Sequence, residues 1–267
     1  MIEVKNLSFA YSGNKVLDNI STVFKQGKIY GLLGANGVGK RTMFKLLCGL
    51  LTTKEGTIDI DGCSPVGRKP EFLSKIFYVP EDFEGPDMTI KKYVAGVSQF
   101  YPNYDSGLFE KLLADFEIDV NRKFTTLSLG QRKRAILALA LALKTEYLFL
   151  DEPTNGLDIP SKTEFRKMVV AAMDDARTII ISTHQVRDVE NLLDHIMILD
   201  KRAVLLDRSI SDIQSEYTFD VSSSVPENAL YVEAGLGGCC SICENRSGEE
   251  SRVNIELLFN YINSKKK

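Results

Sequence analysis

The chain has 267 residues, of which 44% are hydrophobic and 26% are charged. Such a chain is long enough for one large domain with a modest extension. Its formal net charge of −3 gives no excess of positive charge for the phosphates of DNA or RNA, so we expect no nucleic-acid partner. The longest apolar stretch, Ala135 to Leu143, is too short to cross a bilayer, and the first residues lack the pattern of an export signal.

Short runs rich in Val, Ile and aromatic residues alternate with helical patterns along most of the chain. Runs such as Tyr147 to Leu150 are apolar at every position, which is typical of strands buried on both faces. We therefore expect an α/β fold with a mostly parallel sheet covered by helices, and an antiparallel β portion near the N-terminus. The predicted strands are 2–7, 16–24, 29–33, 57–60, 76–79, 147–150, 178–181 and 196–199, and the predicted helices are 40–50, 90–100, 106–116, 130–144, 161–173 and 186–193.

Two segments differ in style from the alternating pattern. Residues 82–140 show helical patterns only, so we expect a helical subdomain there. Towards the C-terminus, short strand patterns are separated by Gly and Ser turns, which predicts a domain of residues 1–212 and a small β-rich extension of residues 213–267. The predicted elements of this last part are a helix at 211–217 and strands at 218–221, 229–233, 239–244 and 252–255.

Three of the five cysteines lie close together, at Cys239, Cys240 and Cys243. A zinc site needs a second pair of Cys or His ligands at suitable spacing, and neither Cys48 nor Cys63 provides one. We therefore expect ordinary reduced thiols in a strand, as is usual in cytosolic proteins.

Residues 34–42 read Gly-Ala-Asn-Gly-Val-Gly-Lys-Arg-Thr and lie between a predicted strand and a predicted helix. The glycines allow the backbone N–H groups to face phosphate oxygens, and the start of a helix favours negative charge. Lys40 supplies a cation for the β- and γ-phosphates of a nucleotide. The alternative, a glycine-rich turn with an incidental lysine, is disfavoured by this strand–loop–helix context. Arg41, however, occupies the position where a Ser or Thr hydroxyl normally holds Mg²⁺.

The apolar strand that precedes residue 151 ends in two carboxylates, Asp151 and Glu152. At this position Asp151 is suited to hold magnesium through water, and Glu152 is suited to polarise an attacking water as a general base. An acidic pair after a strand can instead be a helix cap. Because the phosphate loop is in the same chain, we favour the catalytic interpretation.

The longest predicted helix begins at Leu127 to Gln131. Ser128 is a good N-cap, and that structural role is compatible with a second one. Together with the N–H of Gly130 and the helix dipole, Ser128 can face a phosphate. A second phosphate-facing helix start cannot easily reach the nucleotide of the first loop, so we expect it to contact a nucleotide held by another copy.

In their order, these motifs resemble the nucleotide-binding subunits of ATP-binding-cassette (ABC) transporters, over about residues 1–210. The phosphate loop resembles the Walker A motif of that family, and the acidic strand end resembles its Walker B motif. The start of the long helix resembles the family signature, with Leu129 in place of a glycine. Further matches are a D-loop that ends at Asp158, a switch histidine at His184, and Tyr11 where the family stacks an aromatic ring on adenine.

The resemblance implies a P-loop NTPase core that binds ATP and Mg²⁺ and hydrolyses ATP, with Glu152 and His184 as catalytic residues. It implies a head-to-tail homodimer or heterodimer of ATP-binding subunits, each signature facing the other subunit's nucleotide. It also implies a separate transmembrane permease docked on the helical subdomain, and a cytoplasmic position on the inner face of the cell membrane, as in bacterial exporter systems. The expected nucleotide contacts are Tyr11, Gly34, Asn36, Gly37, Val38, Gly39, Lys40, Arg41 and Thr42 and, from the other subunit, Ser128, Gly130 and Gln131.

Both direct metal ligands depart from the family pattern, in which a hydroxyl follows the Walker A lysine and a glutamine stands where this chain has Glu81. A carboxylate at Glu81 can still bind Mg²⁺ beside Asp151, whereas the guanidinium of Arg41 has no lone pair to offer. We hypothesise that Arg41 pairs with Glu81, Asp151 or both, because unpaired and partly buried carboxylates are costly. Hydrolysis would then be slower than with Ser or Thr at this position. The alternative is that Arg41 points to solvent, and that Thr42 or water completes the coordination.

Three functions are compatible with these features. Intact Glu152 and His184 favour an ATP-hydrolysing subunit of a transporter, which is the interpretation we prefer. Arg41 favours a weakly hydrolysing switch that dimerises on binding ATP. The size of the chain also allows a soluble ABC ATPase, such as an accessory of iron–sulfur assembly.

Overall fold

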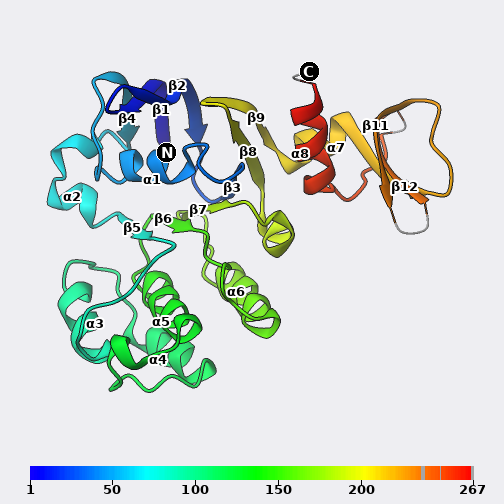
Figure 1. The fold of residues 1–267 in the computed structure, drawn as a ribbon. Helices are drawn as coiled ribbons and strands as arrows, with labels where there is room; N and C mark the ends of the chain where they lie inside the picture. Colours follow the sequence, from blue (N-terminus) through cyan, green and yellow to red (C-terminus); the bar gives the residue numbers. More distant parts are fainter. Residues whose placement is uncertain (236–237, 247, 266–267) are drawn as a thin grey trace.

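The chain folds into an α/β core, a lobe of helices and a C-terminal extension (Figure 1). The structure is a computed structural model that describes residues 1–235, 238–246 and 248–265. Its strands are β1 (Ile2–Tyr11), β2 (Asn14–Phe24), β3 (Ile29–Leu33), β4 (Glu55–Ile60), β5 (Ile76–Val79), β6 (Tyr147–Asp151), β7 (Thr178–Thr183), β8 (His195–Asp200), β9 (Ala203–Ser209), β10 (Tyr217–Ser222), β11 (Ala229–Gly235) and β12 (Gly238–Glu244). Its α-helices are α1 (Lys40–Leu47), α2 (Pro70–Leu73), α3 (Ile90–Ser98), α4 (Ser106–Asp115), α5 (Leu129–Ala142), α6 (Ile159–Ala171), α7 (Ile210–Glu216) and α8 (Ile255–Ser264).

The central sheet has six strands in the order β5-β6-β7-β3-β8-β9. All its neighbours are parallel except β8 and β9, which pair antiparallel. Every residue of β6 and of β7 is buried, as their continuous apolar runs predict for strands covered on both faces. The expected α/β fold with a mostly parallel sheet is therefore confirmed.

A second sheet, β2-β1-β4, is antiparallel and lies beside α1, which confirms the antiparallel portion near the N-terminus. One apolar cluster contains Ile2 from this sheet, Phe44 from α1 and Phe149 from the central sheet. Burial of these side chains fixes α1, and with it the phosphate loop, against one face of the central sheet.

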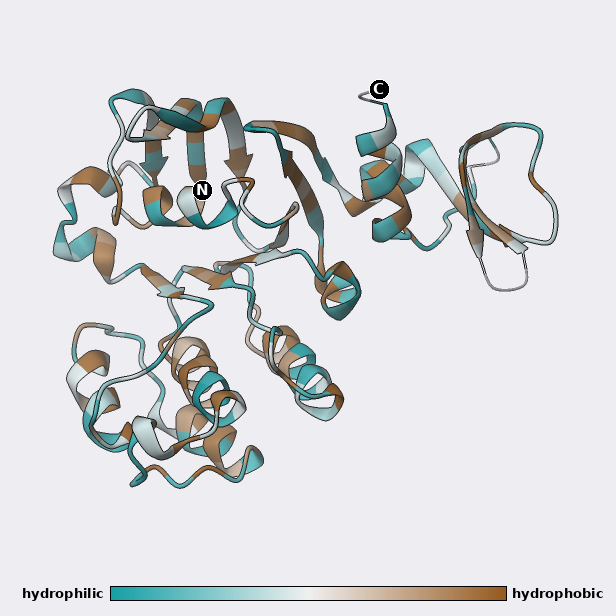
Figure 2. Cartoon of the chain, viewed as in Figure 1, coloured by the Kyte–Doolittle hydropathy of each residue, from teal (hydrophilic) through white to brown (hydrophobic). Residues whose placement is uncertain are grey.

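Helices α3, α4 and α5 form a separate lobe, which β5 joins to the core (Figure 1). The residues of α5 from Ala135 to Ala142 are all buried. A helix that is apolar on all sides is buried by its neighbours. Helix α5 accordingly packs on α4 and on β5. Brown, apolar residues mark part of α5 and most of β8 in Figure 2.

The C-terminal extension contains the antiparallel sheet β10-β12-β11 and the helix α8. Cys239, Cys240 and Cys243 lie in β12 and are free thiols, as are the other two cysteines. The strand predicted at 252–255 is wrong. There Asn254 caps α8 by accepting a hydrogen bond from the N–H of Leu257, so the chain turns into a helix.

The helix predicted at 186–193 is also wrong. In its place are two short 3₁₀ turns, Val186–Asp188 and Glu190–Leu192. They are separated by Val189, whose backbone lies outside the helical region at φ −127° and whose side chain is fully buried. Anchoring Val189 in the core interrupts the helical repeat. The sequence analysis did not predict β9, α2 or α8.

Among the described residues, no helix combines the length and apolar character that crossing a bilayer requires.

Candidate nucleotide-binding site

The phosphate loop connects the end of β3 to the start of α1. Gly39 is the N-cap of α1 and has φ 114°, and a Cβ atom there would lie 2.8 Å from Cδ2 of Leu17. Only glycine fits this backbone and this space. The loop therefore turns tightly enough to direct the first N–H groups of α1 outward, which is the arrangement that binds phosphate at a helix start.

Lys40 is almost completely buried at the centre of this loop, with 6% of its surface exposed. Its ammonium group donates hydrogen bonds to the carbonyl oxygens of Gly34, at 2.7 Å, and Ala35, at 3.2 Å. Burial lowers the pKa of Lys40, and the carboxylate of Glu152, 3.5 Å from Nζ, opposes that shift. Hydrogen bonds to the loop's own carbonyl groups thus hold the ammonium group of Lys40 in place.

The parallel strands β5, β6, β7 and β3 are neighbours, so their carboxyl ends meet at one edge of the sheet. This edge is where ligands bind in open α/β sheets. It brings together residues that are far apart in sequence, because each follows a different strand. A cavity of about 490 Å³ opens there and is lined by Tyr11, Val16, Asn36, Gly37, Gly39, Lys40, Arg41, Thr42, Glu81, Asp151 and Glu152.

Glu152 follows β6 and has a left-handed backbone with φ 48°, which is strained for a non-glycine residue. Oε1 of Glu152 lies 2.9 Å from Nδ1 of His184 and 3.5 Å from Nζ of Lys40. This buried oxygen therefore lies between two side chains that carry nitrogen atoms. Because a carboxylate oxygen has more than one lone pair, it can accept from a bound water as well.

Arg41 pairs with both Asp151 and Glu81. Its Nε donates to Oδ2 of Asp151 at 2.8 Å, its Nη2 pairs with Oε2 of Glu81, and its Nη1 is 3.5 Å from Asp82. Burial alone would lower the pKa of Arg41, but the hydrogen bond and charge of Asp151 raise it. The hypothesis that Arg41 pairs with these carboxylates is confirmed, and the alternative that it points away from them is not observed.

The two expected metal ligands do not fit a divalent cation in this arrangement. Oδ1 of Asp151 accepts from Ser182 at 2.5 Å, and its Oδ2 accepts from Arg41 and Tyr78. Oε1 of Glu81 accepts from an Asn side chain at 2.7 Å, and its Oε2 pairs with Arg41. Each oxygen therefore already has a donor. Within the part of the chain that the structure describes, no cluster of His, Cys, Asp and Glu has the arrangement of a metal site.

The predicted signature residues lie at the start of α5, outside the cavity. Ser128 and Gln131 form a reciprocal capping box, each accepting a hydrogen bond from the other's main chain at 3.2 Å. Ser128 is thus the N-cap that its sequence predicts. Asp158 caps α6 by accepting from the N–H of Ser161, and hydrogen bonds from the side chain and then the main chain of Ser161 lower the pKa of Asp158. Neither Gly130 nor these three residues are among those that line the cavity.

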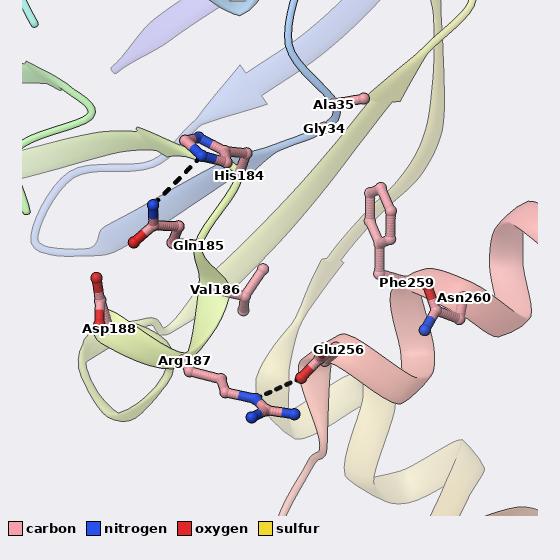
Figure 3. Close-up of a pocket in the computed structure, with 10 residues that line it drawn as sticks. All are labelled: Gly34, Ala35, His184, Gln185, Val186, Arg187, Asp188, Glu256, Phe259 and Asn260. Carbon is pink, nitrogen blue, oxygen red and sulfur yellow. Dashed lines mark hydrogen bonds and ion pairs between the residues drawn. The ribbon is translucent and has the colours of Figure 1, made fainter. Parts of the chain in front are cut away.

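A second cavity, of about 500 Å³, also borders the start of the phosphate loop (Figure 3). Gly34 lines it together with His184 and Gln185, and α8 contributes Phe259 and Asn260. Val38, the remaining predicted loop residue, is partly buried against the apolar cluster that holds α1. Figure 3 shows that α8 faces the loop that carries His184 across this cavity.

Lys133 is a site residue that the sequence analysis missed. It lies in α5 with 5% of its surface exposed, and its Nζ donates to the main-chain oxygens of Glu152, at 3.0 Å, and Asn155. Burial lowers its pKa, and the carboxylate of Glu81 opposes that shift. In sequence, Lys133 is one of three consecutive basic residues, a pattern that usually marks a solvated surface.

Comparisons with known proteins agree with this geometry. A family model described as "ABC transporter" matches residues 17–155. The ABC transporter ATP-binding protein YtrB of Bacillus subtilis is 32% identical over 97% of this chain and 91% of its own length. The lantibiotic transport ATP-binding protein SrtF of Streptococcus pyogenes is 30% identical over 78% of this chain and 90% of its own length. A solved structure titled "Structure of ATP binding subunit of ABC transporter" superposes with a TM-score of 0.72 and 25% identity, over 80% of this chain and 92% of that one. The chain therefore belongs to the ABC transporter family, as one of its ATP-binding subunits.

Proposed function

We propose that this chain binds ATP with its triphosphate in the cavity at the end of β3, and hydrolyses it to drive transport by a separate membrane subunit. The observation that carries the proposal is the convergence of Lys40, Glu152 and His184 at one sheet edge. Lys40 would bind the terminal phosphates, and Tyr11, which lines the same cavity and is 43% exposed, would stack on the base.

In this proposal Glu152 is the general base. Oε1 of Glu152 would accept a proton from water, and His184, 2.9 Å away, would orient that water or the terminal phosphate. The backbone strain at Glu152 supports this role, because strained residues persist where the surrounding fold holds a side chain for function.

We propose that the second half of the site comes from another ATP-binding subunit. Ser128, Gly130 and Gln131 stand at an exposed helix start, away from the cavity of their own chain, and would contact the nucleotide of the partner. Asp158 lies at a similar exposed helix start. Leu129, where the family has a glycine, is 52% exposed and would lie at this interface. In a homodimer or a heterodimer, the start of α5 in one subunit would face the nucleotide cavity of the other.

The test uses Glu152→Gln, which keeps the shape of the side chain and removes the base. We expect turnover of ATP to fall by about 100-fold or more, because a general base contributes on that order. The variant should retain ATP and accumulate as a dimer, which size-exclusion chromatography with light scattering would detect. Glu164→Gln is the matched control, since Glu164 is exposed and pairs only with Lys167 among the described residues. Wild-type turnover in Glu152→Gln would refute the assignment.

A second candidate function is the weakly hydrolysing switch, and Arg41 is the observation that favours it. Its guanidinium pairs with Asp151 beside the general base, so we propose that it slows hydrolysis. Arg41→Thr should then raise the turnover number of purified protein. If native turnover is already high and the substitution leaves it unchanged, the switch and the inhibitory role of Arg41 are both excluded.

We propose that the permease docks in an apolar groove of about 610 Å³ between α2, β5 and α3. Phe100 is 68% exposed and Leu50 is 50% exposed at its rim. Exposed apolar side chains around a groove are typical of protein interaction sites. Docking there would hold the chain at the cytoplasmic face of a membrane. A relative from Cupriavidus metallidurans named as a Nod factor export ATP-binding protein, 27% identical over 75% of this chain, supports transport out of the cell.

A further inference from the structure

The environment of Arg41 suggests how this site binds the nucleotide itself, an inference that depends on the proposed function. The side chain lines the cavity beside Lys40 and remains 43% exposed, although Asp151 beneath it is only 3% exposed. The guanidinium is thus bound to a buried carboxylate through Nε and to Glu81 through Nη2, while its exposed part lines the cavity proposed for the triphosphate.

Every carboxylate oxygen next to Arg41 already has a protein donor, so a divalent cation would compete with these contacts. Ser182 and Tyr78 hold Asp151 from the protein side, at 2.5 Å and 3.2 Å, and Asn155 holds Glu81 at 2.7 Å. Binding a metal there would require breaking the ion pairs of Arg41 with both carboxylates and placing two like charges side by side. The guanidinium already offsets part of the negative charge of these two carboxylates.

Arginine is also suited to bind phosphate oxygens, which is the second role of a metal ion at such a site. A guanidinium has five N–H donors in a planar fork that matches phosphate oxygens, and it stays charged at every physiological pH. In Arg41, Nε donates to Asp151 and Nη2 pairs with Glu81. Nη1 has only a longer contact, of 3.5 Å, with the exposed Asp82. Donors on Nη1 are therefore available to a phosphate in the same cavity.

We propose that this chain binds nucleoside triphosphate without a divalent cation, with Arg41 in the position of the metal. Arg41 and Lys40 form a fixed pair of cations: Lys40 is held by the loop carbonyls, and Arg41 is held by two carboxylates. Nucleotide binding by this subunit therefore does not depend on a divalent cation.

The experiment measures equilibrium binding of a fluorescent ATP analogue to the full chain, once with excess EDTA and once with Mg²⁺. For the native protein we expect the dissociation constants in EDTA and in Mg²⁺ to agree within about threefold. That ratio corresponds to a smaller binding free energy than one strong charged hydrogen bond contributes. For Arg41→Thr we expect binding in EDTA to weaken by about tenfold or more and to be restored by Mg²⁺. Lys111→Thr removes an exposed positive charge from α4 and should behave as the native protein does.

Arg41→Lys distinguishes position from charge, because lysine keeps the charge but lacks the planar fork. It should bind in EDTA more weakly than the native protein and more tightly than Arg41→Thr. Thermal unfolding of each variant verifies that it is folded. If the native protein binds nucleotide only with Mg²⁺, the inference is wrong although the proposed function stands. If the native protein binds no adenine nucleotide under either condition, the proposed function falls as well.

Discussion

Lys133 connects α5 to the loop that follows β6 and carries the proposed general base. Its ammonium donates to two main-chain oxygens, of Glu152 and Asn155, on either side of the turn that follows β6. Asn155 in turn donates from its side chain to Glu81. One buried lysine therefore fixes the backbone that presents the proposed general base, without contacting the cavity itself.

We expect Lys133→Met to reduce turnover more than it reduces ATP affinity. The substitution keeps much of the length and apolar stem of lysine but leaves two carbonyl groups without their donor, and small misplacement of a catalytic group costs about tenfold or more in rate. Kinetic analysis would separate kcat from KM. Lys133→Gln retains a donor and should recover part of the lost rate, and an equal loss in both variants would contradict a positioning role.

Helix α8 lines the second cavity together with His184. It faces the loop after β7, which carries His184, across the second cavity (Figure 3). Two kinds of contact hold it there. Arg187 in the loop pairs with Glu256 at the start of α8, and Leu258 of α8 is fully buried in the main apolar cluster.

We expect the apolar contacts, and not the ion pair, to determine the stability of this docking. Arg187 is 81% exposed and Glu256 is 47% exposed, and such pairs contribute less than about 1 kcal/mol to the free energy of unfolding. Burying a leucine contributes far more, so Leu258→Ala should cost about 2–5 kcal/mol.

Chemical denaturation of Glu256→Gln and Leu258→Ala provides the comparison. Nearly unchanged stability for Glu256→Gln together with a large loss for Leu258→Ala is the expected result. A loss of several kcal/mol for Glu256→Gln would mean that the ion pair is the anchor.

At the scale of the whole molecule, three surfaces lie on different parts of the chain. The nucleotide cavity is at the carboxyl edge of the sheet, the signature is at the start of α5, and the apolar groove lies between the core and the helical lobe. In Figure 1, β5 runs between that core and that lobe, so a partner in the groove would contact both. The proposed boundary between the domain and the extension, at residues 212 and 213, lies within α7.

We expect Phe100→Glu to prevent association with the membrane subunit while ATP binding remains intact. A charge placed at an exposed apolar rim opposes the burial that docking requires. Co-purification with membrane proteins from cells that express the natural partner would measure the effect. Val221→Glu, at an equally exposed apolar residue of β10, serves as the control. Equal recovery of partner with both variants would exclude the groove as the docking site.

The sequence alone determined the family, the α/β fold and the composition of the phosphate loop, because these depend on short motifs and on local periodicity. Gly39, Lys40 and Arg41 are adjacent in sequence, and their chemistry can be recognised there. Only the tertiary structure decided that Arg41 binds two carboxylates that lie 40 and 110 residues away, and that each of their oxygens already has a donor. The structure alone also placed Lys133 under the catalytic loop and α8 beside His184. Sequence spacing does not encode these distances, since they follow from the order in which strands and helices pack.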